Sequence, residues 1–105
     1  MKEISVTELK EMMDSQKDFQ LIDVREKTEY EVCDIGGELI PVNAIPNNVE
    51  KIAKDKMVVV HCRSGKRSAN VIQYLETNFG FTNLYNLQGG ILAWADEIDE
   101  SMPKY

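Results

Sequence analysis

The alternation of short apolar and polar segments along the chain predicts an α/β fold. FQLIDV (19–24) and KMVVVH (56–61) are compact apolar runs, and TNLYNL (82–87) alternates between apolar and polar positions. The apolar, β-branched run in the second segment is typical of a strand covered on both faces. Because segments with helical spacing separate these strands, the pattern predicts a central, mostly parallel sheet with helices on both faces.

The predicted helices begin at recognisable capping residues. Ser5, followed three residues later by Glu8, forms a capping box that predicts a helix from about Val6 to Asp14. In SANVIQYLETNFG (68–80), apolar residues recur at helical spacing, and Ser68 is the predicted cap. Shorter helices are predicted within REKTEYE (25–31), NNVEKIAK (47–54) and GGILAWADEID (89–99).

Length and composition favour one domain spanning residues 1–105, which is large enough to bury a core of its own. The chain has no apolar run of about 18 residues and its N-terminus is polar, so we expect no membrane span, no signal peptide and a cytoplasmic location. The formal net charge of -6 argues against nucleic acid as a partner. Two cysteines are too few for a disulfide framework, and a single histidine gives a metal site little support. No cofactor is expected.

Basic residues nevertheless gather beside one cysteine, in HCRSGKRS (61–68) directly after the clearest predicted strand. A loop between a strand and a helix start can direct N–H groups and the positive end of the helix dipole at an anion. The same field favours a thiolate. We therefore expect Cys62 to be an exposed nucleophile at the mouth of an anion site. The residues expected to bind the anionic substrate are Arg63, Ser64, Gly65, Lys66 and Arg67.

The length of this loop separates two classes of enzyme. Protein tyrosine phosphatases place an arginine after a cysteine and five further residues, a position that Ser68 occupies here. In this chain Arg67 follows Cys62 after four residues. The shorter loop predicts a cradle that suits a single sulfur atom better than a tetrahedral phosphate.

Several motifs together resemble one known family. VVVHCRSGKRS resembles the active-site loop of rhodanese-type sulfurtransferases, and LIDVRE with EYE (21–31) and GGILAW (89–94) agree with it. The match runs from about Ile4 to Trp94. The resemblance implies a rhodanese-like α/β fold and a Cys62 persulfide. Cys62 would take sulfane sulfur from thiosulfate or another small anionic persulfide donor, hold it as the persulfide, and pass it to cyanide, a thiol or an acceptor protein.

The resemblance also implies roles for individual residues. Backbone N–H groups of residues 63–67 would stabilise the persulfide, Arg67 would close the loop, and Asp23, Arg25 and Ser68 would support it. The stretch VCDIGGELIP (32–41) departs from the family's common GHIPGA pattern. In this respect it resembles rhodanese domains fused behind activating enzymes of ubiquitin-like proteins. Whether the domain works alone or with a partner such as an activating enzyme is therefore left open by the sequence.

Some interpretations remain alternatives at this point. Cys33 is either a packed thiol or a resolving thiol for an oxidised or persulfidated Cys62. His61 is a strand-end side chain or a base. A non-catalytic rhodanese-like binding module and a phosphatase or arsenate reductase are the alternative functions. The physiological donor and acceptor and the oligomeric state are not determined by the sequence.

Overall fold

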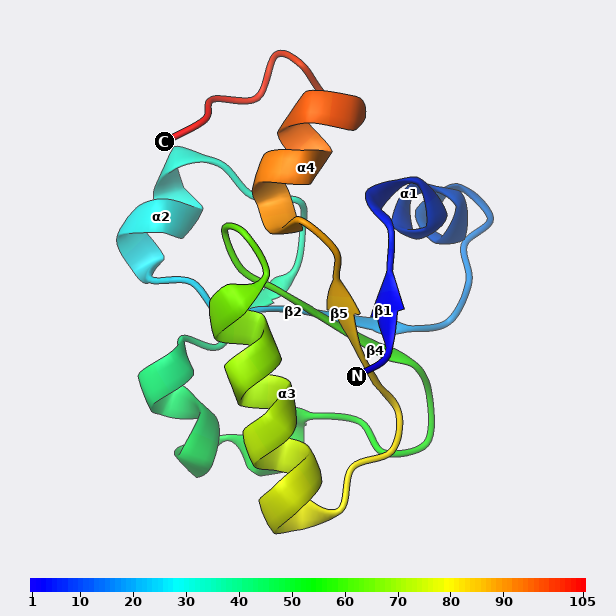
Figure 1. Cartoon of the computed structure of the whole chain (residues 1–105), viewed down its shortest axis with the longest axis vertical. Coiled ribbons are helices and arrows are strands. Elements are labelled where there is room, and N and C mark those ends of the chain that lie inside the picture. Colours follow the sequence, from blue (N-terminus) through cyan, green and yellow to red (C-terminus); the bar gives the residue numbers. More distant parts are fainter.

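The computed structural model describes all 105 residues, which form a five-stranded sheet with helices packed on both of its faces (Figure 1). Every strand pair is parallel, so the sheet is parallel throughout and the predicted α/β fold is confirmed. The strands, in the sheet order β1-β5-β4-β2-β3, are β1 (Glu3–Ile4), β2 (Gln20–Asp23), β3 (Glu38–Leu39), β4 (Val58–His61) and β5 (Leu84–Leu87).

Four α-helices and two short 3₁₀ helices connect the strands. They are α1 (Val6–Asp14), α2 (Lys27–Val32), η1 (Val42–Asn47), η2 (Val49–Lys51), α3 (Lys66–Phe79) and α4 (Gly90–Glu97). The capping box of α1 is present as predicted: Glu8 N–H donates to Ser5 Oγ over 3.1 Å, and Ser5 N–H donates to Glu8 Oε1 over 3.0 Å. None of these helices combines the length and apolar character needed to cross a membrane.

Two helical predictions were wrong in detail. The segment 47–54 contains the end of η1 and all of η2 instead of an α-helix, because the chain turns at Asn48 with i to i+3 hydrogen bonds on both sides. The helix α3 starts at Lys66, two residues before the predicted cap. Gly65, with φ of 105°, is its actual N-cap. Ser68 therefore lies inside the helix, which leaves its hydroxyl group free for another role.

The central strand β4 is buried on both faces, because its side chains alternate between two apolar clusters. Val58 and Val60 pack with α3 and η1 on one side, whereas Val59 packs with α1 and α4 on the other. Figure 1 shows these two pairs of helices on opposite sides of the sheet. The strand is thereby held firmly, and its carboxyl end delivers residue 62 to the edge where the loops of a parallel sheet gather.

The start of α4 packs directly against the loop that follows β4. Ile91 N–H donates to the Cys62 carbonyl over 3.0 Å, and Leu92 N–H donates to the Arg63 carbonyl over 3.1 Å. Gly90 makes this approach possible: a Cβ atom there would lie 2.5 Å from the Arg63 carbonyl oxygen and 2.7 Å from that of Cys62. The second glycine of the GGILAW motif is thus explained by a close backbone contact.

Gly90→Ala is expected to destabilise the protein well beyond the cost of a left-handed backbone. Gly80→Ala is the matched control, since Gly80 has φ of 68° against 60° for Gly90 and open space where its Cβ would be. The control should lose about 1–2 kcal/mol from backbone strain, and Gly90→Ala a further 1–3 kcal/mol or so from overpacking. Urea unfolding measures both losses. If both variants lost the same free energy of unfolding, the close approach of α4 to the loop would not be the source of the loss in Gly90→Ala.

Candidate functional site

The sulfur of Cys62 lies inside a turn of backbone at the carboxyl end of β4. Gly65 N–H donates to Cys62 Sγ over 3.1 Å, and Ser68 Oγ lies 3.4 Å from the same sulfur. Gly65 and Ser68 come from opposite sides of the junction between the loop and α3. The fold therefore brings together the cysteine and the cradle that the sequence predicts around it.

The groups around Cys62 change the pKa of its thiol. Burial by itself raises the pKa of Cys62, but hydrogen bonds from the Ser68 hydroxyl and from the N–H groups of Ser68, Gly65 and Ser64 outweigh it, so the pKa lies below its ordinary value. Two of these N–H groups belong to the predicted range 63–67, and that of Ser68 lies just outside it. The arrangement favours a thiolate.

The expectation that Cys62 is exposed was wrong, because only 1% of the residue is accessible. The first turn of α3 begins earlier than predicted and closes over the sulfur, while α4 binds the carbonyl of the same residue. On its inner side Cys62 packs in the apolar cluster that contains Val60 and Ile72. Any molecule that reacts with this sulfur can reach it only if the loop or the groups packed over it move.

The basic residues of the loop are less free than the sequence suggests. Arg67 forms a two-pronged ion pair with Glu29 of α2, with nitrogen–oxygen distances of 2.7 and 2.9 Å. Arg63 donates to the main-chain oxygen of Tyr105, and its guanidinium carbon lies 5.1 Å from the centre of that tyrosine ring. Lys66 is exposed and has no ion-pair partner. Two of the three predicted anion-binding charges are thus already engaged.

The C-terminal segment 103–105 joins this network. The Tyr105 hydroxyl accepts a hydrogen bond from Arg25 Nη1 over 3.0 Å and donates one to Glu29 Oε2 over 2.8 Å. Cys33 Sγ lies 3.6 Å from the carbonyl oxygen of Pro103, toward which it donates a weak hydrogen bond. Sequence reasoning missed the roles of Glu29 and Tyr105, although EYE was noted as a motif. Glu29 is part of that motif, whereas no pattern singles out Tyr105.

Asp23 and Arg25, predicted as supporting residues, form a fully buried ion pair beside the end of β4. Arg25 Nη2 donates to Asp23 Oδ2 over 2.7 Å, and Arg25 Nε donates to Oδ1 over 2.9 Å. Burial lowers the pKa of Arg25, but hydrogen bonds to Asp23 and Tyr105 more than offset it, and the pKa is raised overall. Arg25 also donates to the Cys33 carbonyl over 2.8 Å, so the pair ties β2 to the segment after α2.

His61 faces away from the sulfur. Its Nδ1 lies 3.4 Å from the Cys62 carbonyl, and its buried Nε2 has no hydrogen-bond partner although Asp23 Oδ2 is 3.6 Å away. Burial lowers the pKa of His61, so the ring is neutral at pH 7. Of the two readings that the sequence allows, this geometry favours the strand-end side chain over the base.

Asn86 of β5 is a third residue that sequence reasoning missed. It is buried, accepts a hydrogen bond from Ser68 Oγ over 2.6 Å, and donates one to the Gly65 carbonyl over 3.0 Å. No local pattern points to this role, because its partners lie 18 and 21 residues earlier in the chain.

Comparison with known proteins identifies the family. The family model of the rhodanese-like domain matches residues 5–97. The chain belongs to this rhodanese-like domain family. The crystal structure of a rhodanese-like domain protein from Staphylococcus aureus superposes with a TM-score of 0.83 at 37% identity, covering 93% of this chain and 95% of that one. The fold is therefore the rhodanese-like α/β fold that the motifs imply.

Relatives of this rhodanese-like chain include whole proteins and parts of longer ones. A sulfurtransferase from Allochromatium vinosum is 37% identical over 94 residues, which cover 89% of this chain and 87% of that protein. The adenylyltransferase/sulfurtransferase MoeZ from Mycobacterium tuberculosis is 35% identical over 105 residues, 97% of this chain. The chain spans only 26% of the length of MoeZ. The names of both relatives support a rhodanese-type sulfurtransferase as the general class.

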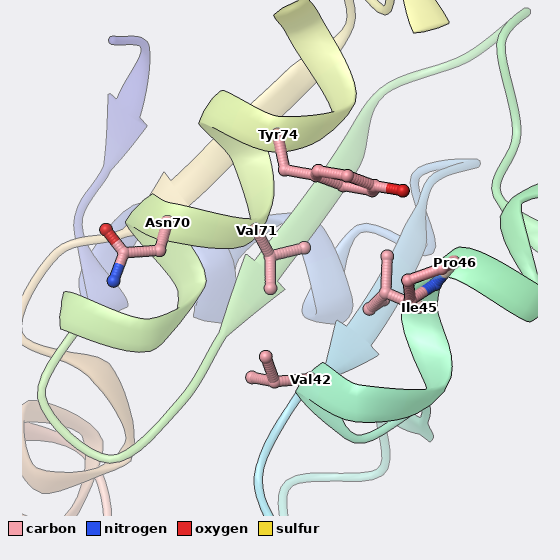
Figure 2. A pocket seen from close by; sticks show the side chains of 6 residues that line it. All are labelled: Val42, Ile45, Pro46, Asn70, Val71 and Tyr74. Carbon is pink, nitrogen blue, oxygen red and sulfur yellow. The ribbon is translucent and has the colours of Figure 1, made fainter. Parts of the chain in front are cut away.

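An apolar pocket of the rhodanese-like chain lies outside the cradle. It has a volume of about 250 Å³ and opens between η1 and α3 (Figure 2). The residues that line it are Val42, Ile45, Pro46, Asn70, Val71 and Tyr74. None of residues 62–67 lines this pocket.

Glu29→Gln is expected to lower the free energy of unfolding at pH 7. The difference from wild type should shrink as the pH falls, because the wild type then loses the same contribution. Hydrogen bonds from Arg67, followed by those from the Glu26 backbone and Tyr105, lower the pKa of Glu29 from 4.5 to about 2 despite burial. A carboxylate with a depressed pKa stabilises the fold above pH 4.5, and this contribution fades as the pH falls toward 2. Because Arg67 is partly exposed and solvent screens the pair, the loss at pH 7 is expected to be about 1 kcal/mol.

Urea unfolding of wild type and variant at pH 7, 4 and 2.5 measures this difference. Glu31→Gln is the control, since Glu31 is an exposed carboxylate of the same helix without an ion-pair partner. A constant gap between Glu29→Gln and wild type across this range would show that the ion pair with Arg67 is not its source.

Proposed function

We propose that the chain is a sulfurtransferase that carries sulfane sulfur on Cys62. The observation that supports this most directly is the buried, hydrogen-bonded sulfur: Gly65 N–H donates to Cys62 Sγ over 3.1 Å. The loop that holds this sulfur is short, because only four residues separate Cys62 from Arg67. A thiolate held by N–H donors is a nucleophile, and the persulfide that forms when a second sulfur is added keeps one negative charge, which then lies on the outer sulfur. The sulfurtransferase relatives support the same class of reaction.

In the first half-reaction, the Cys62 thiolate attacks the outer sulfur of thiosulfate. A bond forms between Cys62 Sγ and that sulfur, and the sulfur–sulfur bond of thiosulfate breaks with its electron pair leaving on sulfite. The products are the Cys62 persulfide anion and sulfite, so the total charge of −3 is unchanged. The N–H groups of Ser64, Gly65 and Ser68, which favour the thiolate, are the donors available to the persulfide.

In the second half-reaction, an acceptor attacks the outer sulfur of the persulfide. Cyanide would leave as thiocyanate and restore the Cys62 thiolate, and a thiol or a protein acceptor would leave as a persulfide or related product. Two half-reactions that share one covalent intermediate predict ping-pong kinetics. The likeness to part of MoeZ, which is named for both adenylyl and sulfur transfer, supports a protein acceptor as an alternative to a small thiol.

The anionic donor would be held by charges at the rim of the cradle. Lys66 has no ion-pair partner, whereas the positive charge of Arg67 is partly neutralised by its ion pair with Glu29. Arg63 is bound to the segment that ends in Tyr105. We therefore propose that Lys66 attracts the donor and that Arg67 stabilises it after the contacts of Arg63 with Tyr105 have shifted.

Incubation with thiosulfate is expected to add about 32 Da to the protein, the mass of one persulfide sulfur. Intact-mass spectrometry detects this gain, and Cys62→Ser should show none. Cys33→Ser is the matched control, because it removes the other thiol and should still gain the mass. A gain on Cys62→Ser would overturn the assignment. No gain on any variant, with hydrolysis of an aryl phosphate, would favour the phosphatase alternative, and neither activity would favour a binding module.

Arg67→Ala is expected to slow persulfide formation from thiosulfate by about 10 to 1,000-fold, the loss of one charge-assisted contact. Removing Arg67 also leaves Glu29 as an unpaired negative charge near the donor. The double variant Arg67→Ala, Glu29→Gln separates these effects. A rate constant for mass gain that stays low in the double variant shows that Arg67 acts on the donor. Full recovery would show that Arg67 only neutralises Glu29.

A further inference from the structure

Asn86 reaches the cradle from the neighbouring strand β5 and contacts it at two points. The residue is 5% exposed, and its amide Nδ2 donates to the Gly65 carbonyl over 3.0 Å. Since a carbonyl only accepts hydrogen bonds, the amide nitrogen must face Gly65, which leaves Oδ1 facing Ser68 at 2.6 Å. Oδ1 also only accepts, so the hydroxyl of Ser68 must be the donor in this contact.

The hydroxyl group of Ser68 has a single hydrogen and two neighbours that can receive it. One is Asn86 Oδ1 at 2.6 Å, and the other is Cys62 Sγ at 3.4 Å. When Cys62 is a thiol, its S–H can donate to Ser68 Oγ while Ser68 donates to Asn86. A thiolate has no hydrogen to give, so Ser68 can stabilise it only by turning its hydrogen away from Asn86.

We propose that Asn86 is a positioning residue that controls, through the direction of the Ser68 hydroxyl, whether the sulfur of Cys62 receives a hydrogen bond from it. The inference deepens the proposed function, because the thiolate is the nucleophile of the first half-reaction. When Cys62 is protonated, the chain of donors runs from Cys62 through Ser68 to Asn86. Ionisation reverses the Ser68 bond and leaves the buried Oδ1 of Asn86 without its donor.

This exchange has an energetic consequence. A buried acceptor that loses its partner carries a desolvation penalty. Asn86 therefore opposes ionisation of Cys62, whereas Ser68 supports it. The pair would set the reactivity of the sulfur between that of a free thiol and that of a fully stabilised thiolate, and would return the hydrogen to Asn86 whenever Cys62 is protonated.

Other charged groups around Cys62 act in parallel and stay unchanged in the test. Arg67 of α3 favours the thiolate through its charge. On β4, His61 is buried and neutral, and in the loop Arg63 and Lys66 carry positive charge. On the β2 side, Asp23 and Arg25 neutralise each other as an ion pair. Glu29 and Tyr105, from α2 and the C-terminal segment, contact Arg67 and Arg25. The residues of α4 nearest the loop, Gly90 to Leu92, carry no ionisable group.

The experiment measures the rate at which iodoacetamide alkylates Cys62 as a function of pH. All proteins carry Cys33→Ser, so that the mass gain reports on one thiol. The single variants are Asn86→Leu, which removes the acceptor, Asn86→Asp, which strengthens it, and Ser68→Ala. Two double variants combine Ser68→Ala with Asn86→Leu or with Asn86→Asp. Alkylation requires no sulfur donor, so failure of the proposed sulfur transfer and failure of this inference give different results.

Asn86→Leu is expected to lower the apparent pKa of Cys62 by about half a unit to one unit, the equivalent of one hydrogen bond. Asn86→Asp and Ser68→Ala are expected to raise it. In the Ser68→Ala background, Asn86→Leu should no longer lower the pKa, because the hydroxyl through which Asn86 acts is absent.

The inference would be overturned if Asn86→Leu shifted the apparent pKa of Cys62 equally with and without Ser68. It would also be overturned if Asn86→Leu and Asn86→Asp shifted that pKa in the same direction. Urea unfolding establishes that each variant is folded. If Asn86→Leu does not fold, Asn86→Asp tests the inference instead. It should raise the apparent pKa of Cys62 more when Ser68 is present than in the Ser68→Ala background. A rise of the same size in both backgrounds would show that only the added charge acts.

Discussion

The site depends on the opposite polarity of the two sides of each peptide group in the loop after β4. The peptide between Arg63 and Ser64 directs its carbonyl to Leu92 of α4, and its N–H is among the groups that stabilise the thiolate of Cys62. Because carbonyl and N–H point in opposite directions across a trans peptide, binding the first to α4 turns the second inward. Gly90 permits this arrangement by bringing the start of α4 against the loop. The acidity of the sulfur thus follows from how two helix starts pack on one turn.

Two of the three arginines around the cradle are paired with carboxylates of the protein. Arg67 is shared with Glu29, and Arg25 is paired with Asp23 and bound to Tyr105. In a closed site such pairing avoids the cost of buried unpaired charge. It also means that an anion entering the site has to compete with contacts that already exist. Selectivity for a donor would then depend on how readily the segment at Tyr105 and the loop exchange these partners.

The three polar residues nearest the sulfur show how one atom is tuned from several elements. Gly65 comes from the loop, Ser68 from α3 and Asn86 from β5, and they are linked by hydrogen bonds of 3.0 and 2.6 Å through Asn86. Because the N-cap of α3 is Gly65 and not Ser68, the serine lies inside the helix, where its hydroxyl reaches both the sulfur of Cys62 and the amide of Asn86. The cap that the sequence predicted at Ser68 is therefore replaced by a contact to the sulfur of Cys62.

The amino-acid sequence by itself determined the features that depend on neighbouring residues. The apolar runs of β2 and β4, the capping box of α1 and the spacing from Cys62 to Arg67 are all local, and they were sufficient to predict the α/β fold and the position of the cradle. Only the tertiary structure decided the burial of Cys62 and the partners of its surroundings. Arg67 meets Glu29 across 38 residues, Arg63 meets Tyr105 across 42, and Ser68 meets Asn86 across 18. Such contacts follow from the order of strands and the packing of helix ends, which no local periodicity or cap encodes.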